Sequence, residues 1–171
     1  MKKTIVLLFL LFFSVASVHA ADVKMGYIDL QKALNNCEAG KAAKEKISVK
    51  VKEYETQIEQ KQKEMKKLKD DLDKQGLILS DEKRAAKKRD FDQKLKDLER
   101  FTKDIQEELQ QQDAEFTRQI IADLSKIINE VGAKDGYTAI FEKTESALLY
   151  ADQNADLTDK AIKAYDASLK K

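Results

Sequence analysis

The sequence has 171 residues, of which 37% are charged, and it contains no proline. Lysine and arginine total 32 and aspartate and glutamate total 31, so the overall charge implies neither nucleic acid nor an acidic membrane as a partner. Proline removes a helix hydrogen bond and clashes with the preceding turn. Its absence, together with this many charges, indicates long solvated helices and not a compact globule.

The N-terminus is predicted to be a signal peptide over residues 1–20. A short basic start is followed by an apolar run from Ile5 to Phe13, and Val18 and Ala20 suit the small-residue rule of signal peptidase. We expect cleavage between Ala20 and Ala21. The alternative is an uncleaved membrane anchor, but the apolar run is shorter than the roughly 20 residues that span a bilayer. The mature chain is therefore expected outside the inner membrane, in the periplasm.

Cleavage leaves little catalytic chemistry in the chain. It removes Lys2, Lys3 and His19, which leaves 30 of the 32 basic residues against 31 acidic ones, and no histidine. A Ser-His-Asp triad, a histidine general base and the usual zinc sites are then excluded. The carboxylates lie on predicted solvated helices, where nothing separates their pKa values, and no glycine-rich phosphate loop occurs. We expect no enzyme, no catalytic residue, no metal and no cofactor.

Residues 41–131 are predicted to form an arm of two antiparallel helices. Apolar residues recur at steps of three, four or seven, which is typical of a coiled-coil seam. In the outgoing helix they are Ile47, Val51, Tyr54, Ile58, Met65, Leu68, Leu72 and Leu79, and in the return helix Phe91, Leu95, Leu98, Ile105, Leu109 and Phe116. The seam is interrupted by Lys61, Gln75, Thr102 and Gln112. The apolar face widens over residues 116–131, so we expect the base of the arm there and an arm that bends and splays.

The tip of the arm is predicted at residues 76–80, where Leu77, Ile78 and Leu79 follow Gly76. These apolar residues either close the turn or contact an apolar or membrane-associated client. Ser80 is expected to cap the return helix. The basic run that follows consists of Lys83, Arg84, Lys87, Lys88 and Arg89. It is either a solvated helix face or a site of attraction for anionic lipid headgroups or acidic clients.

Residues 21–40 and 132–171 are predicted to form a small body with three strands, at 23–28, 136–141 and 147–151. Asp29 is expected to cap a short helix over 30–34, and Thr158 a last amphipathic helix that buries Ala161, Ile162 and Tyr165 on one side. A body of about 60 residues is marginal as a lone core, so oligomerisation is expected. The predicted shared core consists of Tyr27, Ile28, Tyr137, Ile140, Phe141, Leu148 and Tyr150.

Cys37 is the single cysteine of the chain and stands near the foot of the arm. We interpret it as a small, partly buried apolar residue. The alternative is a thiol that cross-links subunits of an exported protein.

Several short motifs support a family assignment. They are Met25-Gly26-Tyr27-Ile28-Asp29-Leu30-Gln31-Lys32-Ala33-Leu34, Glu38-Ala39-Gly40-Lys41, Leu148-Leu149-Tyr150-Ala151-Asp152 and Asp156-Leu157-Thr158. With the long hairpin between them, the chain resembles the Skp (OmpH-like) periplasmic chaperones over its whole mature length. Cys37 is not a feature of that family.

The resemblance implies a mostly α fold with a small β body, assembled as a homotrimer whose arms surround a cavity. It implies ATP-independent holding of unfolded outer-membrane β-barrel proteins, and contact of basic arm residues with lipopolysaccharide or anionic lipid. The hypothesised client-binding residues are Met65, Leu68, Leu72, Leu77, Ile78, Leu79, Phe91, Leu95 and Leu98, although those in the seam also hold the helices together. The alternatives are a coiled-coil envelope scaffold or adaptor and a nucleic-acid binder, against which the signal peptide argues.

Overall fold

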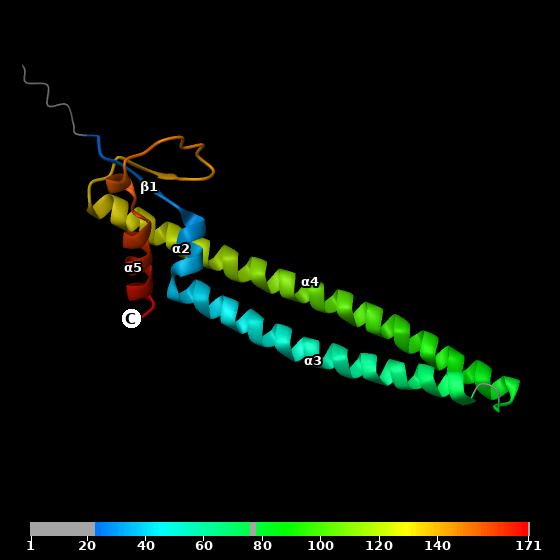
Figure 1. Ribbon diagram of the computed structural model, residues 1–171. Helices are drawn as coiled ribbons and strands as arrows, with labels where there is room; N and C mark the ends of the chain where they lie inside the picture. Colours follow the sequence, from blue (N-terminus) through cyan, green and yellow to red (C-terminus); the bar gives the residue numbers. More distant parts are fainter. Residues whose placement is uncertain (1–22, 76–77, 171) are drawn as a thin grey trace, which may run out of the picture.

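The computed structural model describes residues 23–75 and 78–170. The predicted signal peptide, with its cleavage site, lies outside these residues, as do Gly76 and Leu77 of the predicted tip. Within the described part, a small body stands at one end of a long pair of helices (Figure 1). No helix among the described residues is both long and apolar enough to cross a membrane.

The long pair consists of α3 (Glu38–Gln75) and α4 (Asp81–Lys134), which run antiparallel side by side (Figure 1). With 54 residues and a rise of about 1.5 Å per residue, α4 is roughly 80 Å long. Both helices are rich in lysine, glutamate and glutamine, which favour helix, and no proline interrupts them. The predicted mostly helical fold with an antiparallel hairpin is confirmed.

The body contains a two-stranded sheet. Strands β1 (Met25–Ile28) and β2 (Ala139–Glu142) pair in parallel, with Met25 opposite Ala139 and Ile28 opposite Glu142. Because parallel strands need a long crossover, the whole hairpin lies between them in the chain. β2 begins three residues later than predicted, because Gly136 adopts a left-handed φ of 71° and the Tyr137 N–H donates to the Gly132 carbonyl, which ends α4.

The predicted strand at 147–151 is wrong, because this segment forms no strand within the single chain. After β2 the chain turns, with the Ser146 N–H donating to the Glu142 carbonyl, and Ala147 has a positive φ of 49°. The far edge of β1 is already engaged by a bridge between Tyr27 and Asp156. The segment therefore has no partner strand among the described residues, and the side chains of Leu149 and Tyr150 are 99% and 85% exposed.

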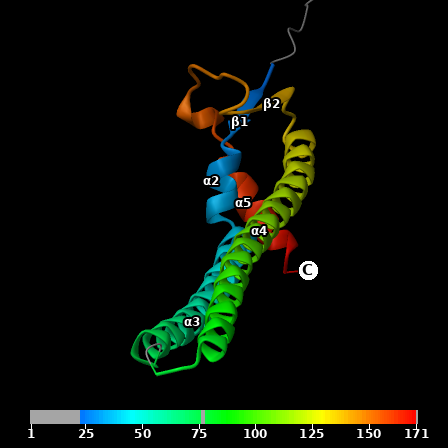
Figure 2. The ribbon, with the colours of Figure 1, turned by 90° about the vertical axis from the view of Figure 1, so that its right-hand side faces the viewer.

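Two apolar clusters join the body to the base of the arm. Helices α2 (Leu30–Asn36) and α5 (Thr158–Ser168) lie beside α4 at this end of the molecule (Figure 2). The first cluster contains Ala33, Cys37, Ile120, Leu124 and Tyr165, and the second contains Ile28, Leu157 and Ala161. Ala161 and Tyr165 are buried and Ile162 is half-buried, so the predicted apolar side of the last helix is confirmed.

Hydrogen bonds at their N-terminal ends connect the two short helices, α2 and α5. Asp29 caps α2 as predicted, because its Oδ1 accepts from the Lys32 N–H at 2.7 Å. The prediction that Thr158 is an N-cap is wrong: Thr158 is the first residue of α5, and its N–H donates to Asp156 Oδ1 at 2.8 Å. The buried Thr158 hydroxyl instead accepts from the Asp29 N–H at 3.0 Å, which joins the start of α5 to the start of α2. Tertiary packing therefore gives this hydroxyl a hydrogen-bond donor on another helix and not on its own.

Candidate functional site

The seam of the arm contains most of the hypothesised client-binding residues. Met65 on α3 and Ile105 on α4 are buried, at 9% and 6% exposed. The half-buried members are Leu68, Leu72, Leu79, Phe91 and Leu98. Met65 of α3 and Leu98 of α4 line one hollow between the two helices. Leu79, predicted at the end of the outgoing helix, lies in the turn beyond it, because α3 ends at Gln75. Leu95 is the most exposed of the predicted apolar seam residues within α3 and α4, at 40%.

Phe101 is a seam residue that the sequence reasoning missed. Its ring meets that of Tyr54 edge to face, with centroids 6.4 Å apart, and the Lys61 ammonium lies 4.9 Å from its centroid. Thr102, which was assigned to the seam instead, is half-buried and its hydroxyl donates to the Leu98 carbonyl of its own helix. The signal was present, because Phe101 stands three residues after Leu98 and four before Ile105.

A polar network crosses the seam at Glu108, which sequence reasoning also missed. Its Oε2 accepts from the Tyr54 hydroxyl at 2.7 Å, and its Oε1 accepts from Lys50 Nζ at 3.1 Å and from Gln112 Nε2 at 2.8 Å. The hydrogen bond from Tyr54, and next that from Lys50, lower the pKa of Glu108 from its ordinary value of 4.5. A directional hydrogen-bond network at one level of the seam favours a single register of the two helices.

Replacing Glu108 with glutamine is expected to lower the melting temperature at neutral pH. A carboxyl whose folded pKa is depressed stabilises the fold above its unfolded pKa, and this contribution is lost as pH falls through the folded pKa. The difference between wild type and Glu108→Gln should therefore be constant near pH 7 and shrink below a pH of about 4.5. Thermal melts followed by circular dichroism at both pH values measure it. A difference that grew on acidification would contradict the assigned role.

The tip places one apolar side chain in solvent. Ile78 is 85% exposed, whereas Leu79 is half-buried and Leu77 lies outside the described residues. Ser80 is the N-cap residue of α4, as predicted, although its side chain makes no capping hydrogen bond. Asp81 and Glu82 occupy the first turn of α4, where carboxylates interact favourably with the positive helix end.

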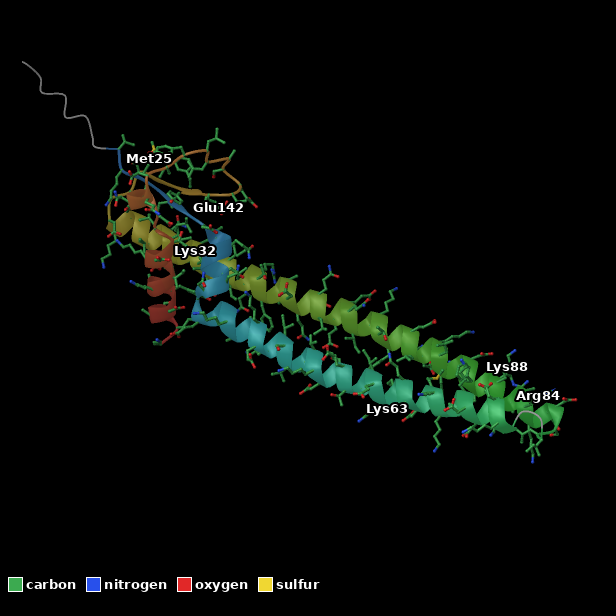
Figure 3. The ribbon with its side chains drawn as sticks, in the orientation of Figure 1. Met25, Lys32, Lys63, Arg84, Lys88 and Glu142 are labelled. Carbon is green, nitrogen blue, oxygen red and sulfur yellow. The ribbon has the colours of Figure 1, made fainter. Side chains whose placement is uncertain are left out.

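The basic run follows the tip on the first two turns of α4. Lys83, Arg84, Lys88 and Arg89 are exposed and Lys87 is half-buried. Figure 3 shows Arg84 and Lys88 at the distal end of the hairpin, far from the body. Five basic residues therefore lie near the end of the arm most remote from the sheet, next to the acidic Asp81 and Glu82.

The foot of the arm is a tight elbow, since α2 ends at Asn36 and α3 begins at Glu38. Cys37 between them is fully buried, as the buried apolar interpretation predicts. Its Sγ accepts from the Gly40 N–H at 3.3 Å and lies 3.6 Å from the Leu34 carbonyl oxygen, to which it donates. The thiol thus satisfies a free N–H in the first turn of α3, as an N-cap side chain does.

Replacing Cys37 with alanine is expected to lower the free energy of unfolding by about 1 kcal/mol, because the Gly40 N–H loses its acceptor. Serine should be tolerated better, because a hydroxyl can both accept from Gly40 and donate to Leu34. Urea unfolding of the two variants measures the difference. Equal losses, or a larger loss for serine, would contradict a stabilising hydrogen bond between this side chain and the Gly40 N–H.

Within the single chain, some residues of the predicted shared core are buried and others are exposed. Tyr27 and Ile28 are buried, at 8% and 2% exposed, while Phe141 and Tyr150 are 41% and 85% exposed. Tyr137, Ile140 and Leu148 are half-buried. Met25 and Leu149 add further exposed apolar surface to this end of the molecule, at 56% and 99%. The body thus presents an apolar surface consisting of Met25, Phe141, Leu149 and Tyr150.

No group of three or more histidine, cysteine, aspartate or glutamate residues in the described part of the chain is arranged to hold a metal ion. What the geometry provides is a long arm with a narrow seam, a polar network across it, charge at its far end and an apolar surface on the body. Such an arrangement suits contact with other polypeptides.

Comparison with known proteins agrees with the fold. The model of the OmpH-like outer membrane protein family matches residues 24–165. A crystal structure from Caulobacter crescentus CB15, described as a candidate outer membrane chaperone (OmpH-like), has a TM-score of 0.80, covers 86% of each chain and is 15% identical, a level that supports the fold alone. A search of curated proteins found no match. Because the family model covers most of its length, the chain belongs to the OmpH-like outer membrane protein family.

Proposed function

We propose that the chain is a periplasmic holdase chaperone, which binds unfolded outer-membrane β-barrel proteins between its arms and prevents their aggregation without ATP. The observation that carries this proposal is the long hairpin of α3 and α4 in a chain of the OmpH-like family. The structural neighbour from Caulobacter crescentus CB15, which shares this fold, is itself described as an outer membrane chaperone candidate.

The physical basis is the incompleteness of the arm as a coiled coil. Between the tip and residue 116, the buried seam residues among those described are Met65 and Ile105. Leu95 and Ile78 are exposed. Unfolded barrel strands alternate apolar and polar residues and aggregate in water. Many weak contacts to sparse apolar spots would hold such a strand, and it would be released when folding elsewhere is more favourable. Neither a catalytic group nor a cofactor is needed.

We further propose that three copies assemble through the body. Two parallel strands alone are marginally stable, and parallel sheets are normally covered on both faces. The apolar surface of Met25, Phe141, Leu149 and Tyr150 would be covered by neighbouring copies, and the unpaired segment 147–151 would gain a strand partner there. Replacing Leu149 and Tyr150 with serine should yield a folded chain of monomer mass in light scattering. An unchanged mass would refute assembly through this segment.

The basic run at the tip is proposed to contact anionic headgroups, of lipopolysaccharide or of phospholipid. Lys83, Lys88 and Arg89 are exposed there. Attraction of this kind is screened by salt and amounts to about 1 kcal/mol per basic residue near the surface. Co-sedimentation with anionic vesicles, weakened by added salt and lost when the three residues are replaced by glutamine, would support it.

The holdase proposal is tested with the mature chain and a urea-denatured outer-membrane barrel protein, diluted together without nucleotide. Turbidity should be suppressed at a stoichiometric amount of chaperone. Absence of suppression would refute the proposal. Capture of one folded envelope partner, with no preference for unfolded protein, would favour a scaffold or adaptor instead.

A further inference from the structure

A hollow of about 270 Å³ lies where the foot of the arm meets the end of the last helix. Its apolar walls come from three helices, through Ala39 and Ala43 of α3, Phe116 and Ile120 of α4, and Tyr165 and Leu169 at the end of α5. The alanines of α3 leave space beside Phe116 that larger side chains would fill. Leu169 is 51% exposed, so the hollow opens to solvent.

Lys46 lies at the rim of this hollow and contributes a positive charge to it. Its ammonium lies 5.8 Å from the centroid of the Phe116 ring. Among residues 23–75 and 78–170, no carboxylate forms an ion pair with Lys46. The acidic residue of the rim, Asp123, is already paired with Lys126 at 2.9 Å.

The hollow on the opposite flank of α3 differs in this respect. It has a volume of about 360 Å³ and is lined by Lys44, Asn35 and Asp113, among others. Lys44 Nζ donates to Asn35 Oδ1 at 2.8 Å, and the Asp113 carboxylate adds a negative charge to the same lining. Each hollow has one lysine and one aspartate in its lining. They differ in that Asp123 at the Lys46 hollow is already paired with Lys126, whereas Lys44 at the larger hollow is already hydrogen-bonded to Asn35.

We propose that the Lys46 hollow binds one large apolar side chain of a client polypeptide that has a carboxylate beside it. This inference rests on the proposed holdase function and assigns one of its contact sites. An apolar cavity of about 150 Å³ already holds a benzene ring, so the volume admits a phenylalanine or leucine side chain. The carboxylate of the neighbouring client residue then lies at the rim, where Lys46 supplies the complementary charge.

The contact is expected to be weak taken singly, because Lys46 stays solvated and exposed ion pairs contribute little. Affinity for a client comes from several such contacts made at the same time. An unfolded chain offers many apolar residues with an acidic neighbour, and each copy of the chaperone offers one such hollow at the foot of its arm. Several weak sites acting together hold a chain without trapping it.

The test uses the full mature protein and an unstructured, dye-labelled ten-residue peptide with one phenylalanine followed by an aspartate. Fluorescence anisotropy compares it with the same peptide carrying Phe→Ala or Asp→Asn. Loss of the ring should weaken binding at least about tenfold, and loss of the carboxylate about threefold. Failure of the wild-type protein to bind the parent peptide, or equal affinity for all three, overturns the inference.

Two variants assign the binding to this hollow. Lys46→Met should bind the Asp and Asn peptides equally, while Lys52→Met, a change of an exposed lysine on the same helix, should keep the threefold difference. Gln119→Trp, at the rim, should block the hollow and weaken the parent peptide at least about tenfold. Circular dichroism checks that each variant folds, and unchanged binding by folded Lys46→Met and Gln119→Trp overturns the assignment.

The outcome is separable from that of the proposed function. Suppression of barrel-protein aggregation by wild-type protein that shows no preference for the parent peptide leaves the holdase proposal standing and removes this site. Failure to suppress aggregation removes the holdase proposal, whatever the peptide does. A fall in the particle mass of folded Gln119→Trp, with no peptide preference in wild type, would show that the hollow is instead covered by a second copy of the chain.

Discussion

Replacing Gly40 with alanine is expected to lower the free energy of unfolding by about 3 kcal/mol or more. A Cβ at this position would stand 1.8 Å from the carbonyl oxygen of Leu34 and 3.3 Å from Cys37 Sγ. The oxygen belongs to the backbone of α2, so it cannot move unless the end of that helix moves. Urea unfolding of the mature chain, at one fixed protein concentration, measures the effect.

Gly132→Ala is the matched control, because Gly132 is also a buried glycine within a long helix. Among the described residues, a Cβ there would meet the side chain of Ile140, with its flexible end, Cδ1, at 3.0 Å and Cγ1 at 4.0 Å. The gain in helix propensity, up to about 1 kcal/mol, should offset the crowding and leave stability nearly unchanged. If Gly40→Ala were as stable as wild type, the tight elbow between α2 and α3 would be wrong.

Replacing Leu124 with alanine should lower the free energy of unfolding by about 3 to 5 kcal/mol. Leu124 is fully buried and packs in one cluster with Ala33, Cys37, Ile120 and Tyr165, which joins the arm to α2 and α5. Removing its branched end leaves a cavity that rigid neighbours on three helices cannot fill. The same urea titration measures the loss.

Val49→Ala provides the comparison for Leu124→Ala. Val49 lies on α3 and is 45% exposed, so truncation should change stability by less than about 0.5 kcal/mol. A loss at Leu124 no larger than that at Val49 would mean that the base of the arm is held by other contacts.

The distribution of burial explains why the arm is separable from the body in this way. Leu124, Ile120, Tyr165 and Ala161 are all buried at the base, whereas the distal hairpin holds few buried residues. A helix pair sealed by one seam opens more readily than a helix packed on several sides. The proposed holding of clients by the arms thus need not disturb the clusters that join the arm to the body.

Much of the hairpin was predictable from spacing alone. Apolar residues at steps of three and four lie on one face of a helix whatever surrounds it, so Met65, Leu98 and Ile105 were placed correctly. Leu95 was not, because a heptad tolerates either of two neighbouring positions and only the partner helix decides which faces inward. Phe101 was missed for the same reason, although its spacing from Leu98 and Ile105 was available.

The errors in the body share a different cause. The segment 147–151 has the composition of a strand, but a strand exists only where another strand offers its edge, and within the single chain none of the described residues does so. Threonine is a common N-cap residue, but the Thr158 hydroxyl accepts a hydrogen bond from the N–H of Asp29, the cap of another helix. In both cases the outcome depends on a partner outside the local sequence, which for Thr158 lies 129 positions away in the chain.

The sequence by itself determined the long helices, their single break and the family of the chain, because helical periodicity and short end motifs are local properties. Tertiary structure alone decided that Gly40 must lack a side chain, that Glu108 gathers Tyr54, Lys50 and Gln112 across the seam, and that a hollow opens beside Lys46. These features depend on the distance between backbones that are remote in sequence. That distance is set by the packing of α2, α3, α4 and α5 against one another. A local sequence pattern does not predict this packing.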